Sequence, residues 1–201
     1  TASQIVELYQ GLHERIVRIA EQSLSAPKLT SAEQVMASIW PTEHIPSRDL
    51  ISASDRALLF AKDQHSLSKP QHMAKLINLA LTDVMAQYPN TIIFGEDVAR
   101  KGGVYHVTSK LVDKFGKERV FNTPLDEQSI LGMAIGAAHN GFIPIPEIQF
   151  LAYVHNAEDQ IRGEAATLPF FSRGQYTNPM VIRIAGLAYQ RGFGGHFHND
   201  N

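Results

Sequence analysis

The chain has 201 residues, of which 44% are hydrophobic and 19% are charged, and its formal net charge is −2. These values are ordinary for a folded globular protein, and they argue against a nucleic-acid-binding protein, whose surface carries a basic patch. The absence of cysteine excludes disulfides and thiolate chemistry, and no apolar run approaches the length of a membrane span. We therefore expect a cytoplasmic protein that contacts neither nucleic acid nor membrane.

The first 41 residues are predicted to form a helical segment. Over residues 4–23, apolar side chains recur at helical spacing with charged side chains between them. A second helix is expected to begin at Ser31, because Ser31 and Gln34 have the spacing of a capping box. Pro41 is expected to end this helix.

Residues 42–72 are expected to be a linker that wraps the next domain, with one short helix at 56–62. After this linker, predicted helices and strands alternate. The expected helices are 73–88, 108–115, 129–140 and 153–167, and the expected strands are 91–95, 119–121, 142–150 and 180–184. Such alternation predicts an α/β fold, with three αβα layers around a mostly parallel sheet.

Glu127 is the first candidate functional residue, because it lies where a predicted strand passes into a predicted helix. In open α/β sheets, ligands bind at such junctions. Acidic residues are also common in a first helical turn, where the helix dipole stabilises them, so a purely local role is the more frequent one. The small residues that follow Glu127 allow close packing, and the preceding segment 123–125 is constrained by Pro124. These two features favour a functional role.

Polar residues also follow two other predicted strands. Glu96 and Asp97 could bind a metal or a hydroxyl group, but we favour a local role in which Asp97 caps the turn and the glycines at 102–103 relieve backbone strain. Gln149 ends the long apolar strand, and Tyr153 follows it. A polar side chain at this place either points into a ligand crevice or bonds to a rim loop, and the pattern leaves both open.

His196 and His198 follow a glycine-rich segment, with Asp200 close behind. In an extended segment the two imidazoles would share a face and could ligate a metal, although the spacing places no third ligand. A single proton-transferring histidine on a glycine loop fits equally well. The residues alone leave both interpretations open.

From about Met73 to His198, ordered motifs resemble the β subunit of the thiamine diphosphate-dependent decarboxylating component of 2-oxo-acid dehydrogenase complexes. The motifs are Phe94–Val98, Gly102–Tyr105, Arg119–Phe121, Thr123–Gln128, Glu147–Phe150, Asp159–Ile161, Ser172–Gln175 and His198. The segment 9–41 is similar to the C-terminal tail of the α subunit. We therefore expect the middle of a fused α-β polypeptide, whose transketolase-like pyrimidine-binding domain, 73–201, is truncated at its C-terminus.

This resemblance implies an oxidoreductase that decarboxylates a 2-oxo acid, either pyruvate or a branched-chain acid, and transfers the acyl group to lipoamide. Glu127 would hydrogen-bond a ring nitrogen of the aminopyrimidine of thiamine diphosphate and so activate the cofactor. Leu125, Gln149 and Tyr153 would line the pyrimidine pocket. His198 would assist proton handling and acyl transfer beside the reacting substrate.

The family's magnesium-diphosphate motif, a Gly-Asp-Gly segment followed by Asn, is absent from the sequence. The resemblance thus implies that an α-type half binds magnesium, that a lipoyl-bearing acyltransferase is a further partner, and that the complete enzyme is a homo-oligomer. This chain alone is expected to be inactive. Two alternatives are a transketolase or deoxyxylulose phosphate synthase-type enzyme, and a non-catalytic α/β module that binds a metal through His196, His198 and Asp200.

Overall fold

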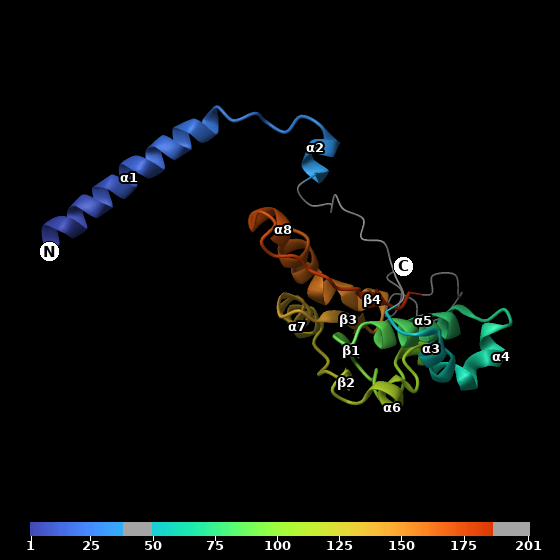
Figure 1. Cartoon of the computed structure of the whole chain (residues 1–201). Coiled ribbons are helices and arrows are strands. Elements are labelled where there is room, and N and C mark those ends of the chain that lie inside the picture. The colour runs from blue at the N-terminus through green and yellow to red at the C-terminus, as the bar shows by residue number, and fades with distance from the viewer. Residues whose placement is uncertain (38–49, 187–201) are drawn as a thin grey trace. The chain divides into compact units, whose positions relative to one another are not determined.

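The computed structural model describes residues 1–37 and 50–186. The chain divides into two compact units, Thr1–Thr42 and Glu43–Asn201, whose elements are labelled in Figure 1. Within the described residues, no helix is long and apolar enough to cross a membrane.

The first unit contains α1 (Ala2–Leu24) and α2 (Ala32–Met36). Both expected helices are therefore present, and no residue of either is buried within this chain. The side chain of Ser31 accepts a hydrogen bond from the backbone N–H of Gln34 at 3.3 Å. The Gln34 side chain accepts from the backbone N–H of Thr30 at 2.7 Å, so the return bond of the predicted capping box goes to the residue before the cap.

The segment ahead of the α/β domain contains more helix than the single stretch expected at 56–62. It forms α3 (Ala53–Leu59), η1 (Ala61–Asp63) and α4 (Gln64–Leu67). Phe60 is buried, and Asp63 pairs with Lys75 of α5 (Met73–Gln87) at 2.8 Å. Part of the expected linker is therefore packed against the domain that it precedes.

The α/β domain is built on four parallel strands in the order β2-β1-β3-β4. Its strands are β1 (Thr91–Gly95), β2 (Val120–Asn122), β3 (Ile143–Ile148) and β4 (Arg183–Ile184). Besides α5, its helices are η2 (Val104–His106), α6 (Leu111–Phe115), α7 (Glu127–His139), η3 (Leu151–Ala157), η4 (Gln160–Ala165) and α8 (Leu168–Phe171). The predicted α/β fold class with a parallel sheet is confirmed.

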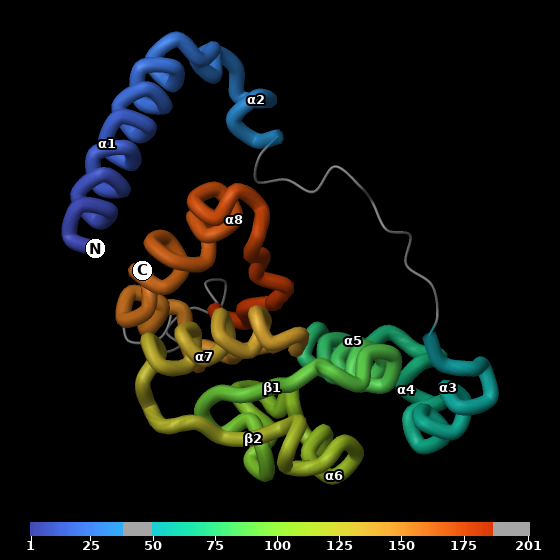
Figure 2. The backbone as a smooth tube through the Cα atoms, turned by 60° about the vertical axis from the view of Figure 1, so that its left-hand side comes forward, coloured from blue at the N-terminus to red at the C-terminus, as the bar shows by residue number. Residues whose placement is uncertain are grey.

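Strand β1 is buried on both faces, which gives the domain its layers. Ile93 packs with side chains of α5 and α6 in one core cluster. Ile92 and Phe94 point the other way and pack with side chains of α7 in a second cluster, because successive side chains of a strand alternate between its faces. Figure 2 shows α6 and α7 on opposite sides of β1 and β2.

Several elements differ from the prediction in their bounds or type. Helix α6 begins at Leu111 rather than at 108, because Lys110 has a left-handed backbone with φ of 63°. The expected helix 153–167 is a 3₁₀-helix followed by a π-helix. Of the expected strand 180–184, only Arg183 and Ile184 form strand β4, although the backbone N–H of Val181 also donates to the carbonyl of Pro144 in β3.

Candidate functional site

The candidate residues lie at one edge of the sheet, because the carboxyl ends of its parallel strands meet there. Gly95, the last residue of β1, is in register with Asn122 of β2 and with Glu147 of β3. The segments that follow these positions carry Glu96, Glu127 and Gln149. The structure thus brings three separate segments of the chain to the edge where a ligand is expected.

Glu127 is turned into the protein by the segment that precedes α7. The backbone N–H of Asp126 donates to the carbonyl of Pro124 at 3.0 Å, which closes a tight turn. Asp126 is the N-cap, and a hydrogen bond from the hydroxyl of Ser129 lowers the pKa of its carboxyl. The side chain of Asp126 is exposed to solvent, whereas that of Glu127 is only 8% exposed. The helix begins two residues earlier than predicted and includes Glu127 as its first residue.

Two polar side chains lie beside Glu127, and the sequence identified neither as its neighbour. Asn156 donates through Nδ2 to Oε2 of Glu127 at 3.1 Å. Glu96 is 7% exposed, and its pKa is raised by burial first, and then by the charges of Glu127 and Asp97. Glu96 and Glu127 are thus two buried acids, and the charge of Glu127 contributes to the raised pKa of Glu96. Neither makes an ion pair with a cation in the part of the chain that the structure describes.

An apolar wall lies on the same side of the sheet as Glu127. Helix η3 packs against α7, and the side chain of Tyr153 packs against the core cluster that includes Phe94 and Ile130. The ring of Tyr153 meets that of Phe150 edge-on, with the ring centroids 5.9 Å apart. Aromatic rings at such a position offer a flat apolar surface on the side of the sheet that α7 covers.

The other two predicted lining residues are placed differently. Gln149 is half-buried and follows directly after β3, which ends at Ile148 rather than at residue 150 as predicted. Leu125 is 83% exposed, so the described residues form no enclosed pocket around it.

A second buried carboxylate lies at the same edge and is held in another way. Glu147 is 1% exposed and pairs with Arg183 of β4 at 2.7 Å. Gly103 approaches it so closely that a Cβ there would lie 2.9 Å from Oε1 of Glu147. Gly102 and Gly103 have φ of 85° and 67°, which confirms that these glycines permit a backbone that other residues rarely adopt.

The histidines at the end of the sequence, His196 and His198, and also Asp200, lie outside the described residues. Within residues 1–37 and 50–186, no group of three or more His, Asp or Glu side chains is placed to hold a metal ion.

The family model described as "Transketolase, pyrimidine binding domain" matches residues 69–190, more than half of the chain. The chain belongs to this family. The match includes the whole sheet, Glu127 and the predicted lining residues, so the predicted pyrimidine-binding domain is confirmed.

Three proteins similar to this chain are β subunits of 2-oxo-acid dehydrogenases. The 3-methyl-2-oxobutanoate dehydrogenase subunit beta of Mycobacterium tuberculosis (strain ATCC 25618 / H37Rv) is 46% identical over 112 residues, which are 56% of this chain and 32% of that protein. The pyruvate dehydrogenase E1 component subunit beta of Bacillus subtilis (strain 168) is 40% identical over 126 residues, 63% of this chain and 37% of that protein.

A third relative, the 2-oxoisovalerate dehydrogenase subunit beta of the same Bacillus strain, is 44% identical over 107 residues, 53% of this chain and 33% of that protein. The resemblance to β subunits of this kind is thus confirmed. The chain spans about a third of the length of each of these relatives.

Proposed function

We propose that this domain is the aminopyrimidine-binding half-site of a thiamine diphosphate-dependent 2-oxo-acid dehydrogenase, which acts on pyruvate or a branched-chain 2-oxo acid and transfers the acyl group to lipoamide. The observation that carries the proposal is the buried carboxylate of Glu127, at the carboxyl edge of the sheet in a pyrimidine-binding domain. The names of the relatives favour a dehydrogenase over a transketolase or a deoxyxylulose phosphate synthase.

The residues present fit an aminopyrimidine. Asn156 engages Oε2 of Glu127, which orients the carboxyl group so that Oε1 can hydrogen-bond a ring nitrogen. Tyr153 offers an apolar surface for a flat ring. When bound, thiamine diphosphate supplies the electron sink for decarboxylation, while the protein supplies orientation and electrostatics.

Glu127 then acts by holding a proton at the bond between its carboxyl group and the pyrimidine nitrogen. Burial strengthens such a bond, because the surrounding protein screens it less than water does. Burial, and then the charges of Glu127 and Asp97, raise the pKa of Glu96, so its neutral form persists to a higher pH than that of an ordinary carboxyl group.

Among residues 1–37 and 50–186, the outer surface of the half-site is left uncovered, which fits a site completed by a second half. Leu125 is largely exposed, and a methyl group added to Gly132 or Gly136 of α7 would meet no other atom within 4 Å. We propose that an α-type half covers this surface and binds magnesium and the diphosphate. In this proposal the complete enzyme is a homo-oligomer, and a lipoyl-bearing acyltransferase is its acceptor partner.

The test of this function is Glu127→Gln in the complete enzyme. The substitution removes the proton that Glu127 exchanges, and such a group contributes a factor of about 10² to 10⁴ in rate. We expect decarboxylation of the 2-oxo acid to fall by about that factor, measured as carbon dioxide release. Glu118→Gln is the matched control, because Glu118 is an exposed acid after α6 and its substitution should leave the rate within about twofold. Equal rates in wild type and Glu127→Gln would refute the proposed role.

The roles of His198, Leu125, Gln149 and Tyr153 remain predictions that separate measurements test. We expect His198→Ala to slow acyl transfer to a lipoyl domain more than it slows carbon dioxide release. For Leu125→Ala, Gln149→Ala and Tyr153→Ala, we expect the cofactor concentration for half-maximal activity to rise. The fused α-β arrangement is tested by reading the upstream coding sequence for the Gly-Asp-Gly motif, and the cytoplasmic location by cell fractionation.

A further inference from the structure

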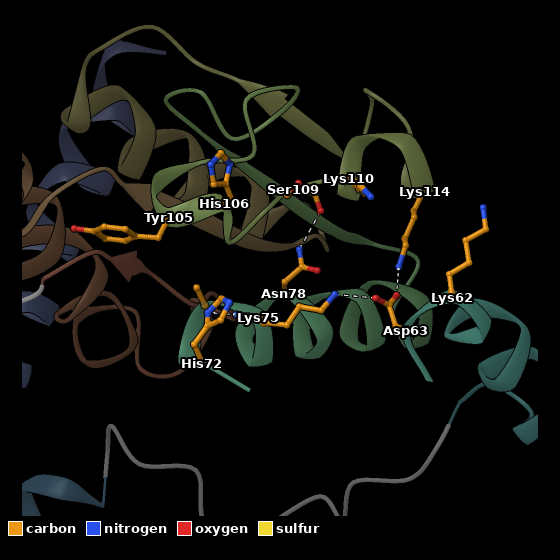
Figure 3. Close-up of a pocket in the computed structure, with 11 residues that line it drawn as sticks. Lys62, Asp63, His72, Lys75, Asn78, Tyr105, His106, Ser109, Lys110 and Lys114 are labelled. Carbon is orange, nitrogen blue, oxygen red and sulfur yellow. Dashed lines mark hydrogen bonds and ion pairs between the residues drawn. The ribbon is translucent and has the colours of Figure 1, made fainter. Parts of the chain in front are cut away.

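A pocket of about 390 Å³ lies between η1, the first half of α5 and the segment from η2 to α6 (Figure 3). It belongs to the face of the sheet that α5 and α6 cover, whereas Glu127 begins α7 on the opposite face. Its basic lining residues are Lys62, His72, Lys75, His106, Lys110 and Lys114. This concentration of cations contrasts with the net charge of −2 of the whole chain.

One carboxylate, Asp63, balances only part of this charge. Asp63 contacts Lys75 at 2.8 Å and Lys114 at 3.4 Å, and the hydrogen bond from Lys75 is the main reason that its pKa is lowered. Lys62 and Lys110 make no ion pair within the described part of the chain. With both histidines neutral, the lining keeps an excess of three positive charges, which attracts anions.

Hydrogen bonds and ion pairs link the elements that form the pocket wall. The side-chain amide of Asn78 donates to the carbonyls of Val107 and Ser109 at 2.8 and 3.1 Å, which ties the loop to α5. Ion pairs from Asp63 reach both α5 and α6. These links matter, because they reduce the cost of ordering the loop when a ligand binds.

Backbone strain is concentrated in the same wall. Tyr105, His106 and Lys110 all line the pocket and have φ of 56°, 58° and 63°. Side-chain-bearing residues rarely adopt such angles, and strained residues of this kind cluster at ligand clamps and active sites.

The pocket offers a second kind of donor besides the lysines. The Nδ1 atom of His72 accepts a hydrogen bond from the backbone N–H of Lys75 at 3.3 Å. In the neutral ring the hydrogen is therefore on Nε2, which can donate. Figure 3 shows lysine side chains at one end of the pocket and Tyr105 at the other, so an anionic group and an apolar group would find separate surfaces.

We propose that this pocket binds a small phosphate-bearing molecule, with its phosphate groups among Lys62, Lys75, Lys110 and Lys114 and its less polar part toward Tyr105. Several ammonium groups around a small volume suit a compact group of two or more negative charges, and lysine is a common phosphate ligand. Inorganic phosphate and an organic phosphate share this chemistry. The pocket volume of about 390 Å³ favours a small molecule over an extended acidic peptide.

The test is calorimetric titration of the full chain with inorganic phosphate, pyrophosphate and a phenyl phosphate ester. We expect saturable one-site binding that weakens as salt is added, because exposed charges are screened. Tighter binding of phenyl phosphate than of inorganic phosphate would identify an organic phosphate as the source, and the reverse order would identify free phosphate. Pyrophosphate should bind more tightly than inorganic phosphate, because it places more charge among the lysines.

The decisive variant is the double substitution Lys62→Gln/Lys110→Gln, which spares the ion pairs of Asp63. We expect the Kd for pyrophosphate to rise by about tenfold or more. Lys117→Gln is the matched control, because Lys117 is exposed after α6 and lies outside the pocket, and it should change the Kd by less than about twofold. Far-UV circular dichroism checks that the variants remain folded.

Three results would overturn the proposal: no saturable binding of any phosphate, an equal loss of affinity in the Lys117 control, or tighter binding of an octaglutamate peptide than of pyrophosphate. The last result would assign the pocket to an acidic protein segment. These titrations need neither the cofactor nor the second half of the enzyme, so their outcome is independent of the proposed catalytic function.

Discussion

Two sets of buried carboxylates lie at the same edge of the sheet, and they differ in the side chains that surround them. Glu147 pairs with Arg183 on the neighbouring strand. Glu127 accepts a hydrogen bond from the neutral Asn156 and lies near a second acid, Glu96. Pairing with arginine compensates the charge of a buried acid. Buried acids without a cation cost free energy, and they are typical of functional sites.

The pKa directions show the same contrast. Burial raises the pKa of Glu147, and the charge of Arg183 opposes that rise. Burial also raises the pKa of Glu96, but there the nearby charges of Glu127 and Asp97 add to the rise. Burial is therefore common to these carboxylates, and what distinguishes them is the charge of the neighbouring side chain.

The largest expected effect on stability comes from breaking the structural pair. Arg183→Met leaves Glu147 buried without a cation, and we expect the free energy of unfolding of the full chain to fall by about 3–5 kcal/mol. Urea unfolding measures this change. Glu127→Gln is the comparison, and we expect it to change the free energy of unfolding by less than about 1 kcal/mol.

The double variant Arg183→Met/Glu147→Met controls for lost packing. We expect it to regain most of the lost stability, because no unpaired charge is left in the interior. A double variant no more stable than Arg183→Met would mean that the arginine acts through packing rather than through charge.

A smaller effect is expected from the glycine that covers Glu147. Gly103→Ala forces a positive φ on a residue with a side chain and places its Cβ against Glu147 and Thr108, so we expect a loss of about 1–3 kcal/mol in the free energy of unfolding. Gly132→Ala has open space around it in a helix and should add about 0.5–1 kcal/mol. Equal effects of the two substitutions would contradict the close approach at Gly103.

The smallest effect concerns the pH dependence of Glu96. Because its folded-state pKa is raised above the ordinary value of 4.5, its contribution to stability is complete below that pH and is lost as the pH rises through the folded-state pKa. The stability of Glu96→Gln relative to wild type should therefore increase from acid to neutral pH. Urea unfolding of both proteins across this range measures the difference, and a relative stability that falls with pH would show that Glu96 is paired with a cation.

Much of this fold was predictable from local patterns. Strand β1 matches its predicted range of 91–95 because an apolar run lies between turn residues. Helix α5 begins where predicted, at Met73, and its C-cap is Tyr88. The late start of α6 was not predictable, because the segment before it is held by long-range hydrogen bonds from Asn78 to the carbonyls of Val107 and Ser109. A single-sequence pattern contains no such contacts.

The site was predictable only in part, for the same reason. Glu127 could be chosen from its place between a strand and a small-residue helix, and its burial agrees with that choice. Asn156 follows Glu127 by 29 residues along the chain, so its hydrogen bond depends on how η3 packs against α7. Glu96 was judged to have a local role, because its proximity to Glu127 depends on the strand order β2-β1-β3.

The most direct test of the central claim, that Glu127 activates a thiamine cofactor, is the exchange rate of the thiazolium carbon-bound proton with deuterium. The measurement uses the complete enzyme loaded with thiamine diphosphate, and compares wild type with Glu127→Gln and with the Glu118→Gln control. We expect exchange to be slower by a factor of about 10² or more in Glu127→Gln alone. An exchange rate in Glu127→Gln equal to that of wild type, with the cofactor bound in both, would contradict the account.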